Sequence, residues 1–453
     1  MLWRALIVAC FLFAVPGRGF EYEEYYDHDL KEGQIWAVLV AGSKGWKNYR
    51  HQSNICHVYH LLTKKHGIPK QNVITFMYDD IAFNEENPNP GVIINAIHGR
   101  DVYKGVVIDY KGRDVNPETF LDVLGGKSIE VGSRRTLESG PNDIVFVNFV
   151  DHGGPGFLSF PDDHLHLTDL TQVLERMYIG RRYRQMLWYV EACHSGSMFS
   201  NLSPYKKIVA HTAAQPDENS HACVYDHDLN VYLSDCWSYN WMKNTEQIFP
   251  NLEQVTVGKQ YEIVKKMTTQ SHASIYGDLT YIYNEQISTF LGHPGEESGT
   301  YQKRHIKHLS GHYQEPVWKA HWAYLPTATP DVMMDHLVRK RARSTNLVDA
   351  VRLTNEIEHH IRTEQKVQKI LEKIALQVTR SKAKVRKFHR HHQTIEDPEC
   401  HKDVLNAFFE WCYKMQTHPY ITKYLHRLTN LCNAYNVVEI RFAVAFNCEE
   451  QNF

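Results

Sequence analysis

Two apolar segments of the sequence are each followed closely by a residue that can take part in acyl transfer. Residues 144–150 lead to His152, and residues 186–190 lead to Cys193. Short continuous apolar segments bounded by turn residues are typical of buried strands in a parallel sheet. The carboxyl ends of such strands meet at one edge of the sheet, where functional groups gather. We therefore expect the thiol of Cys193 and the imidazole of His152 to lie together as a nucleophile and its base.

The surroundings of these two side chains decide between catalysis and an ordinary buried position. A cysteine taken alone is more often an inert part of a core. Here residues 195–197 are Ser-Gly-Ser and predict a tight turn into a helix, and a helix start lowers the pKa of a thiol. Gly153 and Gly154 let backbone approach a substrate closely. The backbone N–H groups of Gly153 and Cys193 are expected to form an oxyanion hole.

The apolar pattern also predicts the elements that position this pair. Strands are expected at 35–40, 73–78, around Val106, 144–150, 186–190 and 207–213. Helices are expected at 48–66, 117–124 and 168–178. Strands that alternate with helices predict an α/β fold whose parallel sheet is covered on both faces.

The pattern changes in the second half of the chain. Residues 292–324 contain Gly, Pro and His without an apolar period and are interpreted as a linker. From Asn346 onwards, apolar residues recur at helical spacing and predict a long amphipathic helix. The basic residues 380–392 are expected to end it, and 400–448 to form a small helical module.

Composition sets the broad class. A chain of 453 residues exceeds the usual size of one core, so two domains are expected. A hydrophobic fraction of 43% and a charged fraction of 23% are ordinary for a soluble globular protein. A net charge of −2 gives no reason to expect nucleic acid or an anionic membrane as a partner.

The beginning of the sequence predicts a secretory signal peptide. Arg4 precedes an apolar run at 5–15, and small residues follow up to Gly19, where cleavage is expected. No later segment is long and apolar enough to span a membrane. We expect a protein of the secretory route, either secreted or in endosomes and lysosomes.

The cysteines support this compartment. Of nine cysteines, four lie in the tail: Cys400, Cys412, Cys432 and Cys448. An even number in a secreted chain predicts two disulfides, with three possible connectivities. A zinc site is the alternative, although no pair has the close spacing of zinc ligands. No metal and no organic cofactor is expected.

Several long motifs make the chain similar to the legumain, or asparaginyl endopeptidase, family. They are Val40–Ser43, Gly45–Trp46, Asn48–Gln52, Met77–Asp80, Asp151–Gly153, Glu191–Cys193 and Ser195–Ser197. The resemblance covers essentially the whole chain. It implies a caspase-like domain with a mainly parallel six-stranded sheet flanked by helices, followed by an all-α, disulfide-linked prodomain. The expected boundaries are 1–19 for the signal peptide, 20–291 for the peptidase domain, 292–345 for the linker and activation segment, and 346–453 for the inhibitory prodomain.

The resemblance assigns roles to individual residues. It implies Cys193 as nucleophile, His152 as base, and Asn48 as the group that orients the histidine. It implies a specificity pocket lined by Arg50, His51, Glu191, Ser220 and Asp235. An asparagine side chain offers one acceptor and one NH₂ donor, so a cation opposite carboxylates matches it and rejects lysine or leucine. Aspartate is expected to fit only when protonated, at lower pH.

Some residues depart from the family or have two interpretations. His194 stands where relatives commonly carry glutamate, which changes the charge beside the thiol. Cys236 is an extra thiol beside the pocket, open either to oxidation or to pairing with Cys223. Asp151 is linked in the family to ligation through a cyclised aspartyl group, and a structural role at the strand end is equally compatible. Asn201 begins an N-glycosylation sequon, followed unfavourably by Pro204.

The family also implies a zymogen whose tail covers the cleft at neutral pH and leaves in acid. The basic tail residues from 380 to 387 would attract ionised Glu191, Asp235 and Asp151, and acid would weaken that attraction. A solvated charged helix without an inhibitory role is the alternative. Asn346 is the candidate for self-processing, whereas the basic residues 339–341 suit another protease.

We therefore predict a cysteine endopeptidase that cleaves after Asn, and more slowly after Asp at acid pH, through an acyl-enzyme. Aminolysis of that intermediate would add ligase activity. The expected partners are protein and peptide substrates, the chain's own prodomain as inhibitor, and cystatin-type inhibitors. Two alternatives are a catalytically silent binding protein of the same fold and an anchor-attaching transamidase, whose membrane-spanning tail is not found in this sequence.

Overall fold

The structure is a computed structural model that describes residues 33–293 and 325–449. The expected signal peptide at 1–19, and residues 294–324 of the expected linker, lie outside the described residues. Within the described part of the chain, no helix is both long and apolar enough to cross a membrane.

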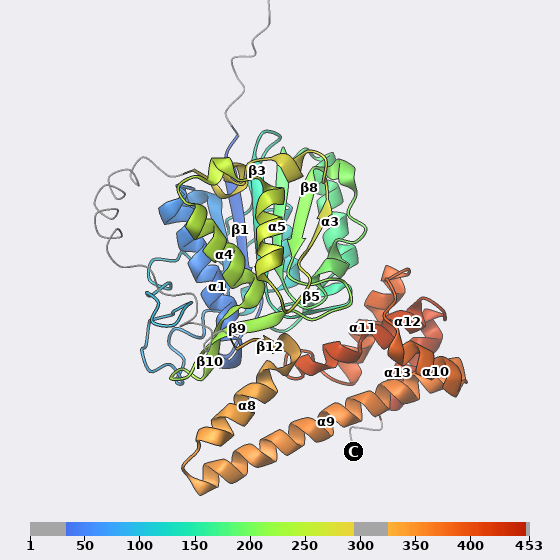
Figure 1. The fold of residues 1–453 in the computed structure, drawn as a ribbon. Helices are drawn as coiled ribbons and strands as arrows, with labels where there is room; N and C mark the ends of the chain where they lie inside the picture. Colours follow the sequence, from blue (N-terminus) through green and yellow to red (C-terminus); the bar gives the residue numbers. More distant parts are fainter. Residues whose placement is uncertain (1–32, 294–324, 450–453) are drawn as a thin grey trace, which may run out of the picture. The chain divides into compact units, whose positions relative to one another are not determined.

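A six-stranded sheet in the order β11-β8-β7-β3-β1-β2 forms the centre of the peptidase part (Figure 1). The strands are β1 (Ile35–Ala41), β2 (Val73–Met77), β3 (Ile144–Val150), β7 (Gln185–Glu191), β8 (Ile208–Thr212) and β11 (Ser274–Gly277). Only β11 is antiparallel to its neighbour. The prediction of a mainly parallel six-stranded sheet is confirmed.

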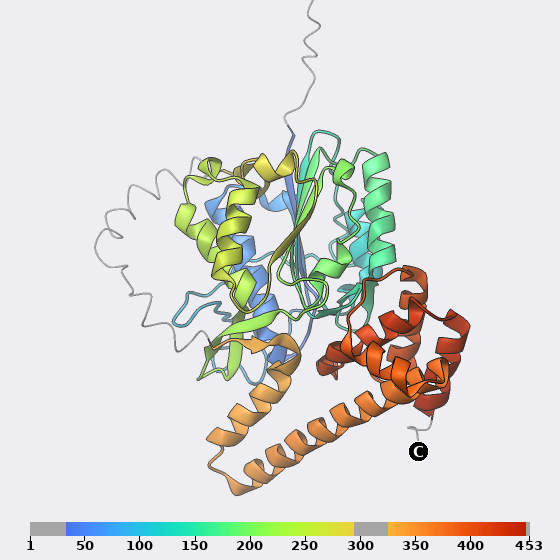
Figure 2. The ribbon, with the colours of Figure 1, turned by 45° about the vertical axis from the view of Figure 1, so that its right-hand side comes forward.

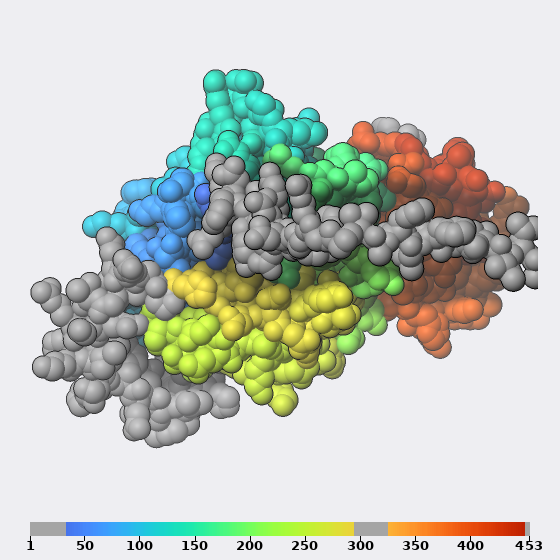
Figure 3. Space-filling model, turned by 90° about the horizontal axis from the view of Figure 1, so that it is seen from above, coloured from blue at the N-terminus to red at the C-terminus, as the bar shows by residue number. Residues whose placement is uncertain are grey.

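Alternate residues of each strand feed two separate cores, which is why helices cover both faces. In β1, Leu39 joins one core and Val40 the other. The first face is covered by α1 (Tyr49–His60), α4 (Cys236–Ile248), α5 (Val257–Met267) and α6 (Ser288–Leu291). The second face is covered by α2 (Pro117–Leu124) and α3 (Leu167–Ile179). Figure 2 shows the helices on either side of the sheet, and Figure 3 shows the surface of the molecule seen from above, coloured along the chain.

Two small sheets lie beyond the carboxyl ends of the central strands. One contains β4 (Gly153–Gly154), β5 (Phe157–Ser159) and β6 (His164–His166). The other has the order β10-β9-β12 and contains β9 (His221–Asp226), β10 (Val231–Asp235) and β12 (Thr327–Ala328). The second sheet therefore pairs a strand of the peptidase part with a segment that follows the linker.

The C-terminal part is all-α, as predicted. Its helices are α8 (Val332–Arg343), α9 (Leu347–Thr379), α10 (Lys382–Arg390), α11 (Pro398–Trp411), α12 (His426–Cys432) and α13 (Val437–Glu449). Disulfides join Cys400 to Cys432 and Cys412 to Cys448, which selects one of the three connectivities. The zinc alternative for these four cysteines is thereby wrong.

Three local expectations are corrected. No strand forms around Val106; the chain turns there, and Tyr110 instead makes an isolated bridge to Phe76. The basic residues after α9 form a separate helix, α10, because Arg380 adopts a left-handed conformation that ends α9. Residues 332–343, within the expected linker and activation segment, are helical.

Candidate active site

The register between β3 and β7 places the predicted nucleophile and base next to each other at the edge of the sheet. In the β3–β7 pair, Val150 lies opposite Glu191, and Asp151 N–H donates to the Glu191 carbonyl at 3.0 Å. His152 and Cys193 each follow this pair by two residues. A Cβ atom added to Gly153 would lie 2.6 Å from the Cys193 carbonyl oxygen, so only glycine fits there. The structure thus places both predicted catalytic side chains at adjacent strand ends.

Asn48 fixes the orientation of the His152 ring. The Asn48 side-chain NH₂ donates to the Lys44 carbonyl at 2.9 Å, which leaves its oxygen to face the ring. His152 Nε2 lies 2.8 Å from that oxygen and must donate its proton to it. The unprotonated Nδ1 is then the basic atom of the ring. Burial, aided by the charge of Arg50, lowers the pKa of His152 to about 3 and keeps the imidazole neutral.

The Cys193 thiol is buried, and its Sγ lies 3.8 Å from the Ser220 hydroxyl. Burial raises the pKa of Cys193 to about 12. The expectation that a helix start lowers this pKa is therefore wrong for this form of the protein. The segment after the thiol is a 3₁₀ helix of four residues, Ser195–Met198, and burial is the largest influence on the pKa of the thiol. The thiol is protonated while the site stays covered.

Three buried side chains from different elements form the floor of the expected specificity pocket. Arg50 in α1 donates from Nε to Asp235, at the end of β10, at 2.7 Å. Asn54 donates to the second oxygen of Asp235 at 2.9 Å. Glu191, at the end of β7, accepts from the backbone and hydroxyl of Ser238 at 2.8 and 3.0 Å. Arg50 and Asp235 are therefore locked in geometry, as is one oxygen of Glu191.

One hydrogen-bond donor of Arg50 and one acceptor of Glu191 have no partner in this pocket. Arg50 Nη2 and Glu191 Oε1 are buried and make no hydrogen bond among the described residues. Burying such groups unpaired is unfavourable, so they define a place for a complementary polar group. An uncharged carboxamide offers both the acceptor and the donor that they lack.

The ionised forms of the carboxyl groups in the pocket are destabilised. Burial raises the pKa of Glu191, and the neighbouring Asp235 raises it further. Burial also raises the pKa of Asp235, although Arg50 opposes this. Each additional negative charge in the pocket is therefore disfavoured.

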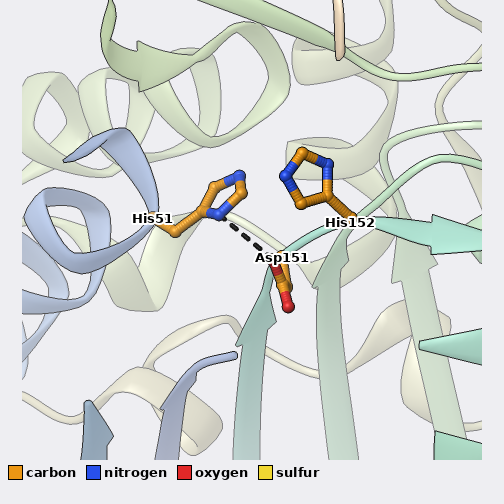
Figure 4. Close-up of side chains that lie close together, drawn as sticks. All are labelled: His51, Asp151 and His152. Atoms are coloured by element: carbon orange, nitrogen blue, oxygen red, sulfur yellow. Dashed lines mark ion pairs between the residues drawn. The ribbon is translucent and has the colours of Figure 1, made fainter. Parts of the chain in front are cut away.

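His51 and Asp151 lie beside the histidine of the expected dyad (Figure 4). His51 Nδ1 lies 2.7 Å from the Ser43 hydroxyl and 3.2 Å from an Asp151 oxygen. The rings of His51 and His152 are 5.1 Å apart and nearly perpendicular. These three side chains are the one set of potential metal ligands among the described residues, with ligand atoms within 4.8 Å of one another. His152 is already committed to Asn48, and we assign the set to positioning the imidazole.

Ser220 connects the site to the segment after the linker. Its hydroxyl lies 3.2 Å from that of Thr329, and its carbonyl accepts from Thr329 N–H at 2.9 Å. The sequence offered no signal for Thr329. Asn54 and Ser238 were also missed; Asn54 could have been found, because it lies four residues after Arg50 and shares its helix face.

The two departures from the family pattern have definite structural outcomes. Cys236 is bonded to Cys223, so it is not a free thiol. His194 has φ = 54°, a left-handed conformation, and its Nδ1 donates to the Pro216 carbonyl at 2.9 Å. Its ring is parallel to that of His392 in the C-terminal part, with centroids 6.4 Å apart.

Both α8 and α11 contact the peptidase part, α8 through pairs such as Asp335 with Tyr232 and Lys340 with Glu86. Lys402 pairs with Asp169 at 2.6 Å, and Asn406 meets His166 at 2.8 Å. Phe409 packs edge-on against Phe157 at 5.5 Å. Among the ion pairs of the described residues, none joins a basic side chain of α10 to Asp151, Glu191 or Asp235. The expected pairing of the basic run with those carboxylates is not found.

A parallel sheet that carries a thiol and an imidazole at adjacent strand ends is typical of a cysteine peptidase. Comparison with known proteins shows which family of cysteine peptidases the chain resembles. Residues 35–293 match the Peptidase C13 family, and residues 351–448 match the legumain prodomain. The chain is 37% identical to human legumain over 437 residues, which cover 95% of each chain. It is 39% identical to a hemoglobinase of Schistosoma japonicum over 411 residues, 90% of this chain and 91% of that one.

A more distant relative is a vacuolar-processing enzyme of Citrus sinensis, 34% identical over 88% of this chain and 82% of that one. The chain belongs to the Peptidase C13, or legumain, family of cysteine endopeptidases and carries the prodomain of that family.

Proposed function

We propose that the protein cleaves peptide bonds after asparagine, and more slowly after aspartate at acid pH. The observation that carries this proposal is the unpaired buried couple, Arg50 Nη2 and Glu191 Oε1. In the proposed complex, the arginine donates to the side-chain oxygen of asparagine and the glutamate accepts from its NH₂ group. A leucine side chain would leave both protein groups unpaired, and a lysine ammonium would leave Arg50 Nη2 unpaired beside a second positive charge, so the pocket selects against both.

The reaction begins when Cys193 Sγ attacks the carbonyl carbon of the asparagine. The thiol proton passes to Nδ1 of His152, whose other nitrogen is held by Asn48. The developing oxyanion accepts from the backbone N–H groups of Gly153 and Cys193. The imidazolium then gives its proton to the leaving amine, and a thioester remains on Cys193. Water hydrolyses the thioester to regenerate the thiol.

The charge of the pocket explains the slower use of aspartate. An ionised aspartate would add a carboxylate beside Glu191 and Asp235, whose pKa values burial already raises. In acid, a protonated aspartate resembles asparagine in shape and can donate to Glu191 Oε1. Cleavage after Asp should therefore increase relative to cleavage after Asn as the pH falls.

The thioester also supports peptide ligation. A peptide amine that reaches the thioester before water forms a new peptide bond and releases Cys193. The site favours this route when the leaving peptide stays bound and keeps water out. Asp151 contributes by positioning His51 next to the imidazole.

The protein is proposed to be made as an acid-activated zymogen. Two groups of histidines lie between the peptidase part and the C-terminal helices. The group beside α11 contains His164, His166 and His401, and we call it the α11 histidines. The group beside α12 contains His194, His392 and His426, and we call it the α12 histidines. The rings of His392 and His426 stack at 3.9 Å. Burial lowers the pKa of His164 and His401 to about 3 and that of His194 to about 4.

These histidines provide an acid trigger. His164, His194, His401 and His426 are neutral while the helices are in place, and would regain an ordinary pKa near 6.5 when exposed. Protons therefore bind the open form more strongly, and the closed form loses stability as the pH falls below about 6.5. Asp217 and Glu218 face His194 and partly oppose this effect. Asp169 and Asp163 do the same for His166, whereas Lys402 adds to the effect.

Such an enzyme suits the acidic end of the secretory pathway, in endosomes or lysosomes. The three disulfides require an oxidising route of synthesis. The proposed self-processing site, Asn346, is exposed and caps the start of α9 by accepting from Val348 N–H. Partial unwinding of this helix start would present the bond after Asn346 to an active site.

A covalent probe tests the proposed chemistry. A peptide ending in an asparagine-derived electrophile should attach to Cys193 after acid activation, as located by mass spectrometry of the digested protein. The same peptide ending in a lysine-derived electrophile is the control and should not react. Labelling at another residue, or equal labelling by both probes, would contradict the proposed nucleophile and pocket and favour the silent binding protein.

A further inference from the structure

A disulfide in the peptidase part joins two elements that meet at the expected specificity pocket. Cys223 lies in β9, and Cys236 is the first residue of α4. The two cysteines are 13 residues apart in the sequence, and the β9–β10 hairpin lies between them. Asp235 lies opposite Ala222 at the open end of this hairpin. The disulfide therefore closes the hairpin at the end that carries a carboxyl group of the pocket.

The start of α4 shares its hydrogen bonds with the pocket. Its N-cap residue, Asp235, makes no side-chain capping bond, and its carboxylate accepts from Arg50 and Asn54 instead. The backbone N–H of Ser238, in the first turn, donates to Glu191 at 2.8 Å. A helix start without its own cap is less stable. The start of α4 thus carries one carboxyl group of the pocket and holds the other.

Strand β9 connects the same disulfide to the expected nucleophile. Ser220 comes directly before β9, and its hydroxyl lies 3.8 Å from Cys193 Sγ. Only His221 and Ala222 separate Ser220 from Cys223 in the sequence. The disulfide therefore ties the segment beside the thiol to the helix start that holds the pocket.

The residue after Cys223 has an unusual backbone conformation. Val224 has φ = 62°, in the left-handed region that β-branched residues avoid. Its neighbours keep the register of the hairpin, since Cys223 lies opposite Ser234 and Tyr225 lies opposite Tyr232. A strained conformation of this kind persists only where the surrounding structure fixes it. The disulfide supplies a constraint of this kind at the adjacent residue.

We propose that the disulfide between Cys223 and Cys236 positions the specificity pocket, so that its loss impairs recognition of a carboxamide more than it impairs the thiol. This inference rests on the proposed function and adds to it two positioning residues that do not touch the substrate. The disulfide keeps the start of α4 at β9, and this start keeps the recognising atoms Arg50 Nη2 and Glu191 Oε1 in place.

Loss of the disulfide has different consequences for the pocket and for the catalytic pair. Without it, the start of α4 is joined covalently to β9 only through the hairpin. Movement of this start would separate Ser238 from Glu191 and Asp235 from Arg50, which are now bonded at 2.8 and 2.7 Å. The expected nucleophile and base follow β7 and β3 of the central sheet instead. The thiol and the imidazole would therefore stay together while the pocket loses its geometry.

Two labelling rates at Cys193 of the acid-activated protein separate the pocket from the thiol. Iodoacetamide reports on the thiol alone, whereas a peptide ending in an asparagine-derived electrophile also needs the pocket. In the double variant Cys223→Ser, Cys236→Ser, the ratio of the peptide rate to the iodoacetamide rate should fall at least tenfold. Cys56→Ser, which replaces a buried free cysteine of the same core, is the matched control and should keep the wild-type ratio. An unchanged ratio in the double variant, even with both rates lowered, would overturn the proposal.

Reduction of wild type gives the same comparison if the double variant does not fold. Dithiothreitol gives two electrons and two protons to the two sulfur atoms, which become thiols, and is itself oxidised to a cyclic disulfide. After removal of the reagent in acid, the ratio of the two rates should fall as in the double variant. Mass spectrometry of the blocked thiols verifies that Cys223 and Cys236 are free. An unchanged ratio with both thiols free would overturn the proposal. The untreated variant Cys400→Ser, Cys432→Ser controls for the C-terminal disulfides and should keep the wild-type ratio.

Untreated wild type separates this inference from the proposed function. If it reacts equally with asparagine-derived and lysine-derived probes, the proposed specificity is wrong, and the inference fails with it. If it prefers the asparagine-derived probe and the double variant keeps the same ratio of rates, only the positioning role of the disulfide is wrong.

Discussion

At the scale of single residues, the proposed mechanism depends on which atoms have hydrogen-bond partners. Asn48 holds one nitrogen of His152 and leaves the other free to accept a proton. Arg50 and Glu191 each bond to the protein and keep one buried atom without a partner, which we propose binds the substrate. These arrangements separate orientation of the base from recognition of the substrate.

Replacing Asn48 by alanine should therefore impair the base without emptying the pocket. We expect kcat for an Asn-containing peptide to fall about 10- to 100-fold with little change in KM, because the imidazole loses its fixed tautomer. Steady-state kinetics of the acid-activated protein measures this. Asn116→Ala removes a helix cap instead and should cost about 1 kcal/mol of stability with kcat unchanged. A KM effect alone in the Asn48 variant would contradict the assigned role.

Changing Glu191 to glutamine tests the charge of the pocket. The variant removes one buried carboxyl group whose pKa burial raises and offers an NH₂ donor to an aspartate side chain. The ratio of kcat/KM for Asp over Asn at neutral pH should rise by about tenfold or more, or about 1.4 kcal/mol. A series of peptides that differ only in this residue provides the measurement. An unchanged ratio would show that Glu191 does not face the substrate side chain.

At the scale of elements, the parts with a strong local pattern could be predicted from the sequence. Strand β3 and helix α2 have the predicted bounds, since apolar runs and the Asn116-Pro117 start act within one segment. Strand β12 could not be predicted, because two residues pair with β9 across more than 100 positions. The unpaired atoms of Arg50 and Glu191 could not be predicted either, since these two residues and their hydrogen-bond partners come from α1, β7, β10 and α4.

The disulfides of the C-terminal part give a prediction at this scale. Cys400 and Cys432 close a loop of 32 residues, which corresponds to about 3–4 kcal/mol of stabilisation. The double variant Cys400→Ser, Cys432→Ser should lower the melting temperature of the zymogen and shift its acid activation to a higher pH. Calorimetry and activation assays at stepwise pH would measure both. Wild-type behaviour in both assays would mean that this helical module does not limit activation.

At the scale of the whole molecule, we propose that the α11 and α12 histidines couple pH to opening. Well above pH 6.5 they are neutral in the open form as well, so the closed form keeps its full stability. As the pH falls towards about 4, the open form gains protons that buried His194 does not take up. Opening should therefore involve the uptake of more than one proton.

The variant His194→Asn tests this coupling. Asparagine tolerates the left-handed backbone at this position and can still donate to the Pro216 carbonyl. Hydrogen exchange of α11 in the Cys193→Ser zymogen, corrected for the pH dependence of intrinsic exchange, should show opening at a lower pH and with a shallower slope. His359→Gln, on an exposed face of α9, should not alter the curve. An identical curve for His194→Asn would exclude this histidine from the trigger.

The central claim is that a carboxamide-selective pocket delivers peptide bonds to Cys193. The most direct measurement compares hydrolysis of peptides that differ only in the residue before the cut, using acid-activated wild type and Cys193→Ser. The account predicts cleavage after Asn at all working pH values, after Asp increasingly in acid, and none after Lys or by the serine variant. Efficient cleavage after Lys, or cleavage that survives loss of the thiol, would contradict it.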